Sequence, residues 1–103
     1  MVTVNRVVGR QHELLTLMLT STDHGRLASA PKNSLLVREG SLDHQQLLEM
    51  ESHGLVCRAK CYVSGLLRFV ATRHGCMQLG LSDEQISEFC RVAVERYGVE
   101  WSN

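Results

Sequence analysis

Three segments of the chain carry apolar residues at the spacing of an amphipathic α-helix, with the apolar positions on one stripe of each helix. These segments span residues 10–20, 42–52 and 83–97. Ser41 or Asp43 can cap the start of the second helix, and Ser82 with Gln85 forms a capping box before the third. Gly98 follows the third helix, where glycine commonly adopts the left-handed conformation that ends a helix. The pattern therefore predicts three helices with defined ends.

Between the second and third helices the hydrophobic period changes from that of a helix to two. Residues 55–63 and 66–71 both alternate, and Ser64-Gly65 between them is a turn signal. The inner, apolar face is predicted to hold Cys57, Ala59, Cys61, Val63, Leu67, Phe69 and Ala71. The outer face is predicted to hold Arg58, Lys60, Tyr62, Arg68 and Val70. This is the pattern of a β-hairpin. Residues 35–37 predict a shorter strand before it, and residues 73–79 predict a short helix after it.

Length and composition indicate a small globular protein. The chain has 103 residues, of which 44% are hydrophobic and 21% charged, so we expect one domain over residues 1–103, with residues 98–103 as a flexible tail. No apolar stretch is long enough to cross a bilayer, and residues 1–6 do not resemble a secretory signal. We therefore expect a cytoplasmic protein with no membrane partner.

Acidic and basic residues are equal in number, 11 of each, but they are segregated along the chain. Residues 39–55 contain four acids and no Lys or Arg, whereas residues 56–79 contain four bases and no acid. Two interpretations stay open: these charges solvate the surface and pair with one another on folding, or they form a bipolar surface that selects a partner by complementarity.

The sequence shows no constellation typical of an enzyme. It has no Gly-rich phosphate loop, no paired-carboxylate signature and no HExxH spacing. One set could supply soft ligands to zinc, although its spacing is unusual. This set comprises Cys57, Cys61, His74 and Cys76. The alternating pattern favours packing cysteines instead, so we expect no catalytic residue, metal or cofactor.

Residues Leu47–Arg58, which contain Gly54-Leu55-Val56, and residues Arg68–Gly75 resemble the end of a winged helix of the MarR and PadR type. The resemblance implies an α+β, winged-helix-like fold with helices packed on a two- or three-stranded antiparallel hairpin and a C-terminal helix. Residues Pro31–Val37 are similar to a stretch of small uncharacterised phage and prophage proteins, which implies a bacterial host cell.

In a DNA-binding winged helix, the helix before the hairpin enters the major groove. Here that helix carries Asp43, Glu49 and Glu51 without Lys or Arg, and carboxylates near phosphates repel. We therefore expect a non-enzymatic phage-type accessory protein that docks on a host or defence protein, as an anti-CRISPR-like inhibitor would. Its expected partner contacts are an acidic helix (Asp43, Gln46 and Glu49) and a basic wing (Arg58, Lys60 and Arg68, with Arg73).

The alternative is a small dimeric DNA-binding regulator that contacts DNA through the basic wing. In either case we expect a homodimer whose contact includes Phe89, Val94 and Trp101.

Overall fold

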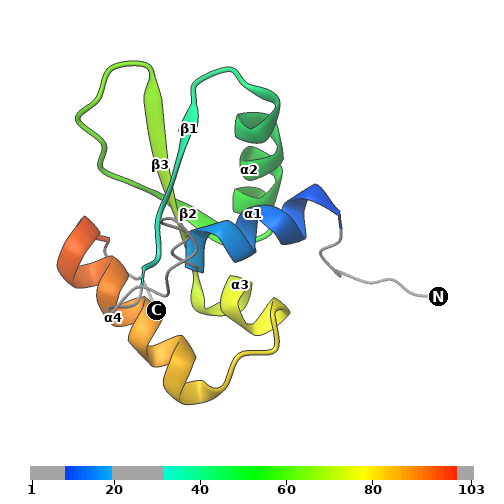
Figure 1. Ribbon diagram of the computed structural model, residues 1–103, viewed down its shortest axis with the longest axis vertical. Coiled ribbons are helices and arrows are strands. Elements are labelled where there is room, and N and C mark those ends of the chain that lie inside the picture. The colour runs from blue at the N-terminus through cyan, green and yellow to red at the C-terminus, as the bar shows by residue number, and fades with distance from the viewer. Residues whose placement is uncertain (1–8, 20–31, 100–103) are drawn as a thin grey trace, which may run out of the picture.

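The computed structural model describes residues 9–19 and 32–99, which form an α+β domain (Figure 1). The described residues contain four helices and one three-stranded antiparallel sheet. In chain order the elements are α1 (Arg10–Leu19), β1 (Leu35–Arg38), α2 (Leu42–Ser52), β2 (Val56–Ala59), β3 (Leu66–Ala71), α3 (Arg73–Gln78) and α4 (Asp83–Tyr97). The predicted helices and the short first strand are confirmed, whereas β2 is shorter than the predicted segment 55–63.

Local capping explains where the helices begin and end. The Ser41 hydroxyl accepts a hydrogen bond from the His44 N–H at the start of α2, and Thr72 does the same for the Gly75 N–H in α3. Ser82 and Gln85 make the predicted capping box of α4. Gly98, with φ of 66°, ends α4 in the left-handed conformation.

The order of the strands is β1-β3-β2, so β3 is the central strand. Its Phe69 lies opposite Leu35 on one side and Arg58 on the other. Cys57 lies opposite Val70, and Ala59 lies opposite Arg68. Because directly opposite residues of an antiparallel pair share a face of the sheet, Cys57 and Ala59 lie on the face opposite to Phe69.

The prediction that Cys57 and Ala59 share an inner face with Leu67, Phe69 and Ala71 is therefore wrong. The reason is that both faces of this sheet are covered, so both contain apolar residues. α1 and α2 pack on the face of Phe69, and their buried residues join it in the main core. On the other face, Val70 packs with Ala93 and Val99, and Cys57, Ala59 and Tyr97 border this second cluster.

A buried asparagine just before β1 connects β3 and α4. Asn33 is fully buried; its Nδ2 donates to the Ala71 and Phe89 carbonyls at 3.0 and 3.1 Å, and its Oδ1 accepts from the Ala71 N–H at 2.8 Å. These bonds join the start of β1 to the end of β3 and to α4. In Figure 1, α1 and α2 lie to the right of the strands and α4 to the lower left. The loop between β2 and β3 lies at the opposite end of the sheet from α3.

Candidate interaction surface

The residues of the predicted acidic contact face α1. Arg10 binds Asp43 through two hydrogen bonds, from Nε to Oδ1 at 3.0 Å and from Nη2 to Oδ2 at 2.8 Å. This guanidinium lowers the pKa of Asp43, mainly through the hydrogen bonds. Gln11 Nε2 donates to Gln46 Oε1 at 2.9 Å and to Glu49 Oε1 at 2.6 Å.

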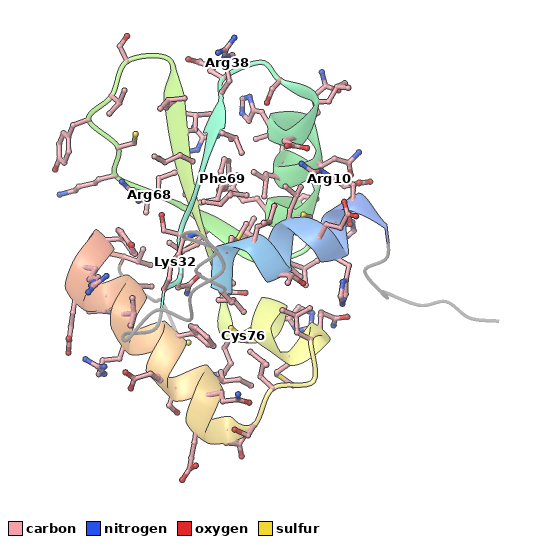
Figure 2. All side chains as sticks on the ribbon, viewed as in Figure 1. Arg10, Lys32, Arg38, Arg68, Phe69 and Cys76 are labelled. Carbon is pink, nitrogen blue, oxygen red and sulfur yellow. The ribbon has the colours of Figure 1, made fainter. Side chains whose placement is uncertain are left out.

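Asp43, Gln46 and Glu49 are thus polar partners of α1, and the interpretation of α2 as a free acidic face needs correction. Figure 2 shows Arg10 directed from the blue helix towards α2. The exposed side of α2 is mixed: Leu42 is 78% exposed and Leu48 is 42% exposed, and Gln45, Glu49 and Ser52 are exposed beside them. This helix therefore presents apolar and polar groups together, without Lys or Arg.

The four cations of the predicted basic wing do not share one face. The Arg58 guanidinium lies 5.5 Å from the ring centre of Phe69, on the face covered by α1 and α2. The Arg68 guanidinium lies 4.7 Å from the ring centre of Tyr97 of α4, on the opposite face. Lys60 is exposed just beyond the end of β2, and Arg73 begins α3 at the other end of β3. The prediction that Arg58, Lys60 and Arg68 share an outer face is therefore wrong.

A different surface lies at the end of the sheet that holds the loop between β2 and β3. It combines exposed apolar and basic side chains, and we name it the hairpin surface. Its members are Leu36, Arg38, Lys60, Tyr62 and Val63. Within it, Tyr62 is 90% exposed and Val63 is 56% exposed.

Backbone hydrogen bonds bring the parts of the hairpin surface together. The Glu39 N–H donates to the Gly65 carbonyl at 3.0 Å, which joins the turn after β1 to the hairpin loop. The Leu66 N–H donates to the Val63 carbonyl at 3.2 Å and closes that loop. Leu36 and Arg38 were not among the predicted contacts. The alternation of residues 35–38 could have identified them, because it places both on the face opposite to Val37.

The predicted oligomer contacts differ in their environment. Phe89 is half-buried and packs against the main core, so it belongs to the interior of this domain. Val94 is 44% exposed on α4, and Trp101 lies outside the described residues. Of the three residues, Val94 is the one that the structure places on the surface.

The cysteines and histidines that the structure describes do not assemble a metal site. Among residues 9–19 and 32–99, no group of three or more His, Cys, Asp or Glu side chains could hold a metal ion. Cys76 is buried in the main core, whereas Cys61 lies in the hairpin loop. Burial raises the pKa of Cys57 to about 11 and that of Cys76 to about 12, so both thiols are protonated at neutral pH.

A shallow cavity of about 500 Å³ lies along α1. Its described lining consists of Arg10, His12, Glu13, Thr16 and Leu17, all from this one helix. Arg10 is engaged by Asp43 and Glu13. The described side chains around the cavity therefore do not converge on one point from different elements, as those of a catalytic site do.

Within the described ranges, no helix is both long and apolar enough to span a membrane. Comparison with known proteins found no matching family model, no similar curated protein and no similar solved structure.

Proposed function

We propose that this chain is a non-enzymatic binding protein that docks on a protein partner through the hairpin surface. The observation that carries this proposal is the exposure of Tyr62 and Val63 in the loop that follows Lys60, which a backbone hydrogen bond joins to the turn after Arg38. Arg38 and Lys60 have no ion pair within the part of the chain that the structure describes. Aromatic residues and arginine are enriched in protein interfaces, and exposed apolar side chains gain stability when a partner covers them.

Three carboxylates of the domain are paired away from the hairpin surface, and Arg38 and Lys60 take part in none of these pairs. Asp43 is bound by Arg10, and Glu88 and Glu95 are bound by Arg91 on α4. Glu39, in the turn after β1, is the acidic residue that neighbours the hairpin surface in sequence. An acidic partner is therefore favoured by charge complementarity. The resemblance to phage proteins is consistent with a host or defence protein as that partner.

A DNA-binding winged helix is the second candidate. It is favoured by the β1-β3-β2 sheet, whose hairpin follows α2, and by the cations Arg38 and Lys60. Two observations favour a protein instead. One helix, without Lys or Arg, lies between β1 and β2, and its exposed residues include Leu42, Leu48 and the acidic Glu49, which repels phosphates; Gln45 is the exposed residue on it that could contact a base edge. Arg58 and Arg68 also lie on opposite faces of the sheet, so they cannot contact one phosphate backbone together.

The proposal is tested by affinity capture from nuclease-treated bacterial lysate with three forms of the chain. The doubly substituted form Tyr62→Glu, Val63→Glu places like charges where an acidic partner would dock. Met77→Glu changes an exposed apolar residue on α3, away from the hairpin surface (Figure 1). A protein that the wild type and Met77→Glu retain, and that the double variant loses, supports docking at the hairpin surface. Equal capture by all three forms contradicts it.

The DNA alternative is tested by gel shift over a range of salt concentrations. If DNA is the ligand, replacing Arg38 and Lys60 with Ala lowers the affinity and flattens its salt dependence, because fewer counterions are released. Tight, sequence-selective binding at physiological salt that depends on these two residues would overturn the protein-docking proposal.

A further inference from the structure

Arg68 is held in a fixed position by contacts from three parts of the chain. Its Nε donates to the Lys60 carbonyl at 3.0 Å and its Nη1 donates to the Ser34 hydroxyl at 2.5 Å. Its guanidinium stacks on Tyr97, with 4.7 Å from Cζ to the ring centre. These contacts come from the end of β2, the start of β1 and the last turn of α4. The side chain has therefore lost its rotational freedom before any partner arrives.

All of these contacts are with neutral groups. Among the described residues, no carboxylate forms an ion pair with Arg68, so its positive charge is not neutralised within the domain. The two hydrogen bonds use Nε and Nη1, so within the described residues the hydrogens of Nη2 have no acceptor. A planar guanidinium with unused N–H groups is matched to a carboxylate, which accepts hydrogen bonds at both oxygens.

Arg68 also adjoins the hairpin surface. Leu36 on the neighbouring strand β1 lies directly opposite Arg68, on the same face of the sheet. Arg38 lies on this face too, two residues further along β1. The Lys60 carbonyl that fixes Arg68 belongs to another member of that surface. Figure 2 shows Arg68 between the strands and the C-terminal end of α4.

We propose that Arg68 is the anchor that receives a carboxylate of an acidic protein segment docked on the hairpin surface. The inference rests on the proposed function and gives the partner its chemistry: an extended segment in which Glu or Asp residues alternate with apolar residues. An apolar residue of that segment contacts Leu36, and an acidic residue binds Arg68. Because Arg68 is already held in place, little entropy is lost when the carboxylate binds.

The test is an NMR titration that follows the Nε–Hε resonance of Arg68. The probe is an acetylated and amidated hexapeptide of alternating leucine and glutamate, and the control probe has glutamine in place of each glutamate. Arg68→Lys keeps the charge but loses the planar group, and Arg96→Lys makes the same change at an exposed site on α4. We expect the acidic peptide to shift the Arg68 resonance saturably, and Arg68→Lys to weaken binding about tenfold. Arg96→Lys leaves the affinity unchanged.

Four results overturn the inference. They are no saturable shift at millimolar acidic peptide, equal shifts with the glutamine peptide, equal affinity of Arg68→Lys and wild type, and a shift produced by inorganic phosphate but not by the peptide. Failure of the inference is separable from failure of the proposed function. If Arg68→Lys still captures the partner that the Tyr62→Glu, Val63→Glu form loses, docking at the hairpin surface stands and the carboxylate anchor does not.

Discussion

Replacing Gly75 with Ala is expected to destabilise this protein strongly, although alanine is the better helix former. Gly75 lies inside α3 and is buried. A Cβ at this position would lie 2.1 Å from the carbonyl oxygen of Leu55 and 3.4 Å from Cδ2 of Leu15. The first distance must grow beyond 3.0 Å before the contact is tolerable, and the atom in the way belongs to the backbone. α3 must therefore move away from the segment between α2 and β2.

The magnitude follows from what that movement disturbs. The Thr72 N–H donates to the same Leu55 carbonyl at 3.1 Å, and the Thr72 hydroxyl donates to the Gly54 carbonyl at 2.5 Å. Overpacking of a close contact costs about 1–3 kcal/mol, and a weakened hydrogen bond costs about 1 kcal/mol more. The higher helix propensity of alanine returns about 1 kcal/mol. We expect a net loss of about 1–3 kcal/mol in the free energy of unfolding.

Urea denaturation followed by circular dichroism measures this loss directly. Gly40→Ala is the matched control, because Gly40 has a φ of 85° and open space around it. That substitution introduces backbone strain without a collision and costs about 1 kcal/mol. If Gly75→Ala is as stable as the wild type, or less destabilising than Gly40→Ala, the close approach of α3 to Leu55 is refuted.

Three further predictions concern the polar core, the pair between α1 and α2, and the thiols. Asn33→Ala leaves the Ala71 N–H and the carbonyls of Ala71 and Phe89 without their partner. We expect it to cost about 2–4 kcal/mol of unfolding free energy, measured by urea denaturation. An unchanged midpoint would contradict these buried hydrogen bonds. Because Arg10 lowers the pKa of Asp43, the pair stabilises the fold above the ordinary aspartate pKa, and this contribution is lost as pH falls through the lowered value. Asp43→Asn should therefore make stability less dependent on pH in the acidic range, and a carboxyl titration by NMR at the ordinary aspartate value would refute the pairing. With their pKa values raised to about 11 and about 12, Cys57 and Cys76 should resist iodoacetamide at pH 8 in the folded protein and react on unfolding. Mass spectrometry of the alkylated peptides measures the extent of labelling at each cysteine. Labelling of the native protein at the rate of a free thiol would contradict the burial of these two side chains.

The sequence alone determined the elements that depend on local chemistry. The helical spans of α2 and α4, the cap at Ser41, the capping box at Ser82 and the left-handed Gly98 are all recognisable within a few residues, and the structure confirms them. The apolar stripes of these helices are confirmed in part, because Leu48 on α2 and Val94 on α4 are exposed. The turn at Ser64-Gly65 and the extended β3 were likewise predictable. These features depend on backbone hydrogen bonds and side-chain spacing within one segment.

Only the tertiary structure decided which side of the sheet each β2 residue faces and where the charges go. Cys57 and Ala59 are apolar because α4 covers them, not because they share the core with Phe69, and a period-two pattern cannot distinguish two covered faces from one. Likewise, Asp43 and Glu49 form an acidic run in the sequence, but Arg10 and Gln11, more than thirty residues earlier, bind their carboxylates. Helix packing brings those groups together, and packing depends on contacts between segments that are distant along the chain. For the same reason, the sequence predicted Arg68 as an exposed wing residue, whereas the fold surrounds it with Ser34, the Lys60 carbonyl and Tyr97.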